Sequence, residues 1–229
     1  MNNFKASPDP FAQKYDYQHA LHYLKKHRTG LSRKLSNWRE QQIAKLALKA
    51  AGNPLKILDI PCGAGRFWPV LATNKQREII AADNSEHMLE VAKKYSYQEI
   101  RSQISLLHTS AYHIQLPDNA VDNIFCMRLI HHIGNPNDRL KILKEFHRVT
   151  NNTVCVSLWV DGNYKARRRK KQEDKKKFKS KTYQNRFVIP RNQIENEFTN
   201  AGFEIIGKHN LVKYYSMWRI YTLRKIPSR

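Results

Sequence analysis

The residues with the clearest chemical potential lie in Leu58-Asp59-Ile60-Pro61-Cys62-Gly63-Ala64-Gly65, between an apolar run and a helical pattern. Gly63 and Gly65 let the backbone turn tightly and approach a ligand closely. Asp83 ends the next apolar run, 18 residues after Gly65, and a carboxylate there can accept hydrogen bonds from both hydroxyls of a ribose. Together these features point to an adenosine-containing ligand. Trp68 stands where a dinucleotide fingerprint needs a third glycine, which disfavours NAD and FAD.

Alternating strand and helix patterns must position these residues. Short apolar runs predict five buried strands, with helical patterns between them. This alternation predicts an α/β fold: a doubly wound, mostly parallel, Rossmann-like sheet, which two C-terminal strands extend to seven. The expected strands are 55–60, 78–82, 104–107, 121–127, 153–160, 204–206 and 218–223. In such open sheets, ligands bind at the carboxyl ends of the strands.

The chain divides by pattern into four parts. An N-terminal helical cap (1–51) breaks near Gly30, and the cofactor-binding α/β core follows at 52–160. Residues 161–186 are a basic insertion after the fifth strand, with too few apolar side chains for a core, and we expect it to be mobile or weakly helical. Residues 187–229 supply a helix and the final strands of the same domain.

Composition narrows the class of protein. The 229 residues carry 41 Lys and Arg against 19 Asp and Glu, a formal charge of +22, while 41% are hydrophobic. The chain therefore has enough apolar residues to form a hydrophobic core, and its net positive charge predicts an anionic partner. No apolar stretch reaches the roughly 18 residues of a spanning helix, and no secretory signal is visible. Cys62, Cys126 and Cys155 lie far apart, which argues against disulfides and a metal site and favours a cytoplasmic location.

Four motifs give the chain a resemblance to class I S-adenosylmethionine-dependent methyltransferases of the type 11-like group. Asp59–Gly65 resembles the family's glycine motif, with Pro61 in place of a common glycine. The other three are 82–89, 116–122 and 126–133. The resemblance implies S-adenosyl-L-methionine as cofactor and a methyltransferase activity. The residues it implies for cofactor binding are Asp59, Pro61, Cys62, Gly63, Gly65, Asp83, Asn84, Met88, Ser110, Ala111 and Met127.

Within that resemblance, Asp59 supplies negative charge toward the cofactor's ammonium group or its water shell, and Met88 lies on the adenine. Ser110 departs from the family pattern, because an acid often contacts the adenine amino group at this position. A hydroxyl can still accept one hydrogen bond there, without charge assistance. This departure keeps open the alternative of a binding protein that holds a cofactor without catalysis.

His131 and His132 are the candidate general bases, and a base is needed only if the acceptor's nucleophile is protonated at neutral pH. The alternative is that neither histidine takes part in proton transfer. Nothing in the local sequence lowers the pKa of Cys62 or Cys126, so both are interpreted as packing residues.

The basic segments predict where the acceptor binds. An N-terminal cluster contains Lys25 and Lys26, and the insertion contains Arg167, Arg168 and Arg169; Arg128 follows the fourth strand. Basic tracts with interleaved aromatics suit phosphate backbones and stacked bases, so RNA is favoured as the anionic substrate. A small molecule, a phosphorylated glycolipid or peripheral contact with phospholipid is the alternative. The sequence gives no oligomeric state.

Overall fold

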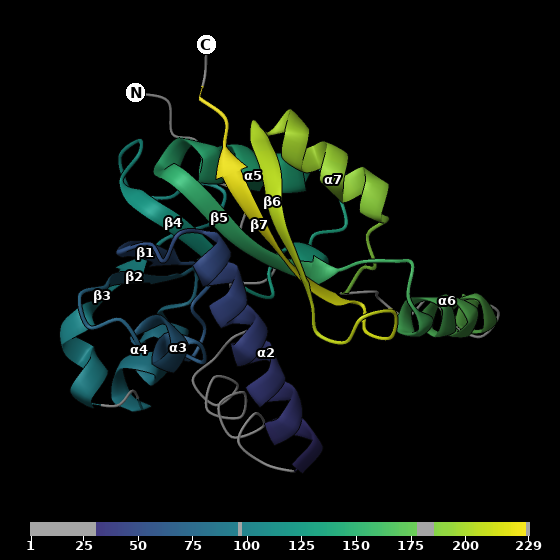
Figure 1. The fold of residues 1–229 in the computed structure, drawn as a ribbon, viewed down its shortest axis with the longest axis horizontal. Helices are drawn as coiled ribbons and strands as arrows, with labels where there is room; N and C mark the ends of the chain where they lie inside the picture. Colours follow the sequence, from purple (N-terminus) through teal and green to yellow (C-terminus); the bar gives the residue numbers. More distant parts are fainter. Residues whose placement is uncertain (1–30, 96–97, 178–185, 228–229) are drawn as a thin grey trace.

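Seven strands form one sheet in the computed structural model, which describes residues 31–95, 98–177 and 186–227 (Figure 1). Their order is β3-β2-β1-β4-β5-β7-β6. β1 to β5 pair in parallel, while β7 runs antiparallel to both β5 and β6. The bounds are β1 Lys56–Asp59, β2 Glu78–Asp83, β3 Ile104–His108, β4 Val121–Cys126, β5 Thr150–Trp159, β6 Phe203–Asn210 and β7 Trp218–Lys225. The predicted doubly wound, mostly parallel sheet is confirmed.

Helices cover both faces of the sheet, and each face buries its own apolar cluster. On one face α5 and α7 pack through Phe146 and Phe198; on the other, α2, α3 and α4 pack through Ile43, Leu71 and Leu89. Burial of apolar area on both faces explains why the strands read as continuous apolar runs. The helices are α2 Leu31–Ala50, α3 Trp68–Leu71, α4 Glu86–Tyr95, α5 Pro136–Val149, α6 Tyr164–Lys177 and α7 Arg191–Asn200, with short 3₁₀ turns at Gln98–Gln103 and Ile130–His132.

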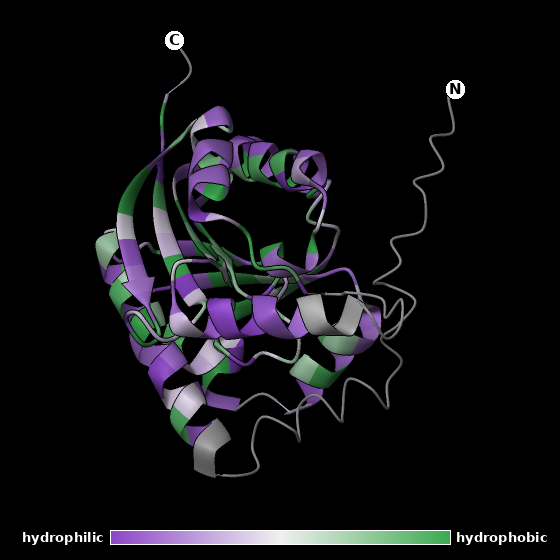
Figure 2. Cartoon of the chain, turned by 90° about the vertical axis from the view of Figure 1, so that its right-hand side faces the viewer, coloured by the Kyte–Doolittle hydropathy of each residue, from purple (hydrophilic) through white to green (hydrophobic). Residues whose placement is uncertain are grey.

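The basic insertion contains a regular helix, α6, which projects from one end of the sheet (Figure 1). Asn163 caps it, because its side-chain oxygen accepts the N–H of Ala166 at 2.9 Å. The N–H groups of Tyr164 and Lys165 donate to the carbonyls of Tyr214 and Tyr215, at 2.9 and 3.1 Å. α6 is therefore attached to the β6–β7 connection, and its surface is predominantly hydrophilic (Figure 2).

Two sequence-based expectations differ from the structure in extent. β6 continues to Asn210, well beyond the predicted 204–206, because it pairs with β7 along its whole length. The N-terminal helical pattern is represented by α2 alone, since residues 1–30, with Lys25 and Lys26, lie outside the described residues. Within the described part of the chain, no helix is long and apolar enough to cross a membrane.

Candidate functional site

A cavity of about 730 Å³ opens where the parallel strands β1, β2, β4 and β5 end. The carboxyl ends of parallel strands share one edge of the sheet, so residues distant in sequence meet there. Most of the predicted site residues line this cavity: Pro61, Cys62, Gly63, Asp83, Asn84, Met88, Ser110, Ala111, Met127, Arg128, His131 and His132. Asp59, Gly65, Arg167, Arg168 and Arg169 are not among the lining residues.

The glycine turn and the second strand meet through the carboxylate of Asp83. Its Oδ2 accepts the N–H of Gly63 at 2.9 Å, and its Oδ1 accepts the N–H of Ser85 at 2.9 Å. Burial raises the pKa of Asp83, while the bonds from these backbone N–H groups oppose that rise. The backbone of Asn84 is a third hydrogen-bond partner of this carboxylate. An ionised carboxylate has about four acceptor sites, so about one remains beyond these backbone bonds.

The backbone of Gly63 borders open space. Gly63 has φ +53, and a Cβ built there would meet no atom within 4 Å. An atom of a ligand can therefore approach this backbone without obstruction from the protein. Across the cavity, the Ser110 hydroxyl accepts the N–H of Tyr112 at 3.3 Å and retains capacity for one more bond.

Asp59 and Gly65 support the site from behind. The indole N–H of Trp68 donates to Asp59 at 3.1 Å, and Asp59 is 1% exposed. Burial raises the pKa of Asp59 well above its ordinary value. A Cβ on Gly65 would lie 2.7 Å from the Trp68 ring. Both residues therefore pack against Trp68, and the expected charge of Asp59 toward the cofactor stays a prediction.

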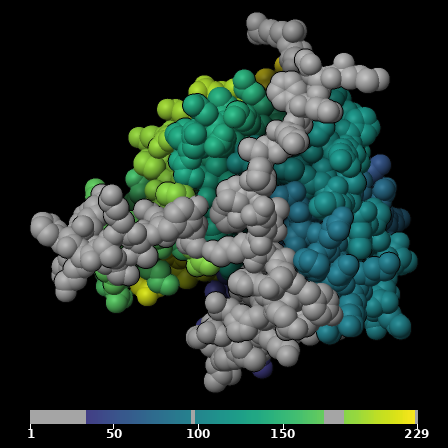
Figure 3. All heavy atoms as spheres, turned by 180° about the vertical axis from the view of Figure 1, so that it is seen from behind, coloured from purple at the N-terminus to yellow at the C-terminus, as the bar shows by residue number. Residues whose placement is uncertain are grey.

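The side of the cavity toward β5 is basic and aromatic. We call it the outer chamber, and it includes side chains from α2, β5, the first turn of α6 and the β6–β7 connection. In Figure 3, α6 (green) and the C-terminal connection (yellow) meet at one end of the molecule, away from α4. The outer chamber comprises Ser36, Glu40, Arg66, Arg128, His131, His132, Trp159, Lys165, Arg186, Leu211, Ser216, Met217 and Trp218.

A buried ion cluster joins α2 to this chamber. Glu40, 4% exposed, pairs with Arg66 at 2.9 Å and with Arg128 at 2.7 Å. The guanidinium of Arg128 also lies 4.9 Å from the centre of the Trp218 ring. Arg128 adopts φ +68, and its backbone N–H donates to Ser157 at 2.8 Å. Such positive φ values in residues other than glycine cluster at ligand sites, where surrounding contacts enforce them.

His131 lies at the centre of the chamber's aromatic group. Its ring stacks on Trp159 at 4.9 Å, meets Trp218 edge-on at 5.5 Å and lies 4.3 Å from the ring of His132. Burial, followed by the positive charges of His132, Arg128, Arg186 and Arg169, lowers the pKa of His131 well below its ordinary value. A neutral imidazole is able to accept a proton. The same lowered pKa makes His131 a weak base, so His131 and His132 both remain candidates, and both line the cavity.

Comparison with known proteins agrees with this geometry. Residues 57–153 match the family described as a methyltransferase domain. This segment of the chain is similar to a methyltransferase domain. A demethylmenaquinone methyltransferase from Geobacillus kaustophilus is 28% identical over 145 residues, which are 60% of this chain and 58% of that protein. An uncharacterized methyltransferase from Schizosaccharomyces pombe is 32% identical over 93 residues, covering 41% of this chain and 34% of its own.

The chain thus spans less than two thirds of the length of these curated relatives. Among solved structures, magnesium protoporphyrin IX methyltransferase from Synechocystis, crystallised with bound SAH, has a TM-score of 0.69 at 16% identity. The match covers 92% of this chain and 97% of that one. At this identity the likeness establishes a shared fold.

Several residues at the cavity were not predicted as site residues. Glu40 is one of them, because its partner Arg128, which was predicted, is 88 positions away. Trp159 is another, because it ends a strand whose sequence pattern is typical of the core. Lys165 and Arg186 belong to the predicted basic insertion, yet nothing in that run separates them from Arg167 and Arg168, which are exposed on α6. Lys165 and Arg186 differ from their neighbours only because the fold places them at the cavity, and the sequence of a basic run does not show this placement.

Proposed function

We propose that this protein is an S-adenosylmethionine-dependent methyltransferase that acts on an anionic acceptor. The observation that supports this most strongly is that Gly63 and Asp83 line the same cavity as the basic outer chamber. Its volume of about 730 Å³ lies within the usual range for small-molecule and cofactor sites. The curated relatives and the Synechocystis enzyme support the reaction class.

The residues present fit the cofactor. Asp83 would accept a hydrogen bond from a ribose hydroxyl at the acceptor site that its backbone partners leave, and Gly63 would let the cofactor lie against the backbone. Met88, which is 4% exposed, would contact the adenine, and Ser110 would accept a bond from its amino group. Asp59 would act by fixing Trp68 behind the glycine turn.

The sulfonium of the bound cofactor supplies an activated methyl group, so the protein mainly has to position the acceptor. If the acceptor is a hydroxyl, its proton must leave as the new bond forms. We assign this role to one of the two cavity histidines, His131 or His132, since both line the cavity. The outer chamber would hold the rest of the acceptor in place.

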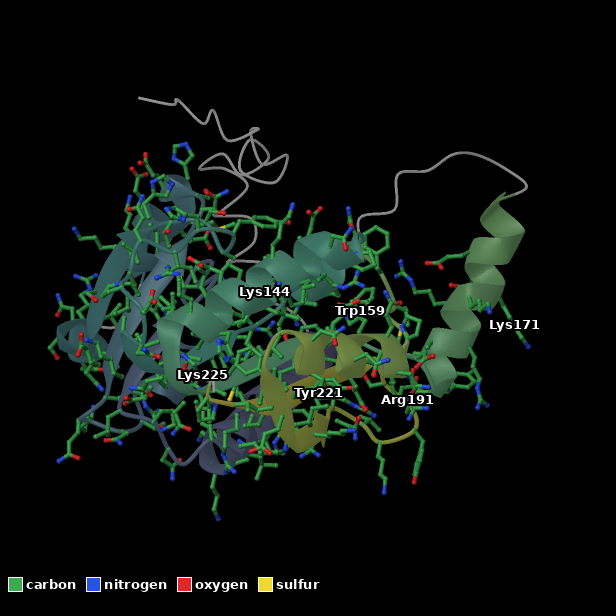
Figure 4. All side chains as sticks on the ribbon, turned by 90° about the horizontal axis from the view of Figure 1, so that it is seen from above. Lys144, Trp159, Lys171, Arg191, Tyr221 and Lys225 are labelled. Atoms are coloured by element: carbon green, nitrogen blue, oxygen red, sulfur yellow. The ribbon has the colours of Figure 1, made fainter. Side chains whose placement is uncertain are left out.

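RNA remains the first candidate for the acceptor because α6 presents an exposed basic surface beside the cavity. Arg167, Arg168 and Lys171 are exposed there, and Lys171 points outward in Figure 4. Loss of one phosphate contact to a single strand lowers the salt slope of binding by about 0.7. We therefore expect Lys171→Gln to flatten the slope, while Lys144→Gln, an exposed lysine on α5, leaves it unchanged. Equal slopes for both variants would exclude α6 from the interface.

A phosphorylated small molecule or glycolipid is the second candidate, favoured by the aromatic walls of the outer chamber. The deciding experiment transfers label from S-adenosylmethionine into an extract that lacks this protein, followed by separation of RNA, protein, lipid and small molecules. Label in one fraction identifies the acceptor class. No label in any fraction, with calorimetry showing that the cofactor binds, would favour the alternative of a non-catalytic cofactor-binding protein. Absence of cofactor binding would refute the proposed function.

A further inference from the structure

The outer chamber concentrates positive charge around one aromatic ring, Trp159. The guanidinium of Arg169 lies 5.0 Å from the centre of this ring, and that of Arg186 lies 5.8 Å from it. Lys165, one helical turn before Arg169, lines the same cavity. Figure 4 shows Trp159 between the body of the protein and α6. Cationic side chains from two segments therefore meet at a single aromatic platform.

Acidic side chains do not balance this charge. Among the described residues of the chamber and its rim, Glu40 pairs with Arg66 and Arg128, and Glu173 pairs with Arg169. Lys165 and Arg186 add to these three arginines, so five basic groups stand near two acidic ones. The positive charges that depress the pKa of His131 belong to this same group. A site of this kind gains most from a ligand with more than one negative charge.

The platform is held in place by the backbone around it. The carbonyl of His131 accepts the N–H of Phe187 at 2.7 Å, which fixes the position of the neighbouring Arg186. The side chain of Arg169 donates to the carbonyl of Arg186 at 3.0 Å, which joins α6 to the segment that contains Arg186 and Phe187. The Tyr164 ring stacks on Tyr215 at 5.7 Å and 7°. The cationic groups are thus arranged before any ligand arrives, which lowers the entropic cost of binding.

We propose that the outer chamber contains a phosphate-binding acceptor subsite formed by Arg186 at Trp159 and by Lys165, whose ammonium lies 4.9 Å from the centre of the Tyr215 ring, with Arg128 deeper in the cavity. A phosphate group offers three strong acceptor oxygens and up to two negative charges, which matches several converging cations better than a single carboxylate does. This subsite deepens the proposed function, since it names the group by which the acceptor is held.

The test measures phosphate binding to the cofactor-free full chain by tryptophan fluorescence and calorimetry. Inorganic phosphate is the first probe. Lys165→Gln and Arg186→Gln are each expected to weaken its binding by roughly tenfold or more, the effect of losing a hydrogen bond to a charged group. Arg224→Gln is the matched control: Arg224 is an exposed arginine on β7 that pairs with Glu204. The Arg224→Gln variant should bind phosphate as tightly as the unmodified chain does.

Two further probes identify the source of the phosphate. Displacement of inorganic phosphate by oligouridylate supports a subsite for nucleic acid, and displacement by phosphatidylcholine vesicles containing phosphatidic acid supports one for a lipid headgroup. Binding that neither probe displaces supports a small phosphorylated acceptor. Absent phosphate binding, or equal weakening in all three variants, would overturn the subsite.

S-adenosylmethionine binding is titrated separately in every variant. Cofactor binding without phosphate binding would overturn the subsite alone. Phosphate binding without cofactor binding would instead overturn the proposed function.

Discussion

Alanine variants of the two glycines in the Asp59–Gly65 turn distinguish two roles, the close approach of a ligand at Gly63 and internal packing at Gly65. Both have positive φ, +53 at Gly63 and +72 at Gly65, so an alanine at either position carries a backbone cost of about 1–2 kcal/mol. Their surroundings differ. A Cβ on Gly63 meets nothing within 4 Å, whereas a Cβ on Gly65 lies 2.7 Å from Cδ2 and Cε3 of Trp68.

The Trp68 ring cannot easily give way. It is 1% exposed, and its N–H donates to Asp59. Overpacking of this kind costs about 1–3 kcal/mol, so Gly65→Ala should lower the free energy of unfolding by about 2–5 kcal/mol in all. Gly63→Ala should lower it by about 1–2 kcal/mol only. Urea denaturation of the cofactor-free chain measures both changes.

Cofactor affinity should follow the opposite order. In Gly63→Ala the added methyl group occupies space that the cofactor needs, and a cost of about 1–3 kcal/mol raises Kd roughly 5- to 150-fold. Gly65→Ala should leave the Kd of the folded protein close to its original value. Calorimetric titration with S-adenosylmethionine decides. If Gly63→Ala binds the cofactor normally, or Gly65→Ala binds poorly while fully folded, the division of roles between the two glycines is wrong.

Three further predictions address the carboxylates and the buried imidazole. Asp83→Ala should weaken cofactor binding by about 1–3 kcal/mol in calorimetry, and an unchanged Kd would exclude the ribose contact. Glu40→Gln leaves two arginines without their shared carboxylate, so unfolding in urea should show a loss of about 3 kcal/mol; Glu78→Gln, at an exposed ion pair, should change stability by less than about 1 kcal/mol. Because the folded-state pKa of His131 is lowered, the unfolded chain binds a proton first as pH falls. Stability should therefore fall below about pH 6.5, by up to about 1.4 kcal/mol per pH unit, and His131→Gln should flatten this dependence.

The part of the site built from neighbouring strand ends was predictable from the sequence. Gly63 and Asp83 each follow a buried strand, and parallel pairing of β1 with β2 makes their meeting a consequence of the fold. The motif alone could not separate Gly63 from Gly65, because both satisfy the same pattern and only the place of Trp68 distinguishes them. Glu40 was unpredictable for another reason: its partner Arg128 is 88 residues away, and no periodicity reports such a contact.

The acceptor therefore has to be inferred from the chamber and not from the relatives. Residues 57–153 carry the family match, and they contain the glycine turn and Asp83. Glu40, Trp159, Lys165, Arg186 and Trp218 all lie outside that range, on segments that surround the common sheet. The concentration of cations around Trp159 is a property of this chain, and its acceptor should be the molecule whose negative charge that platform can hold.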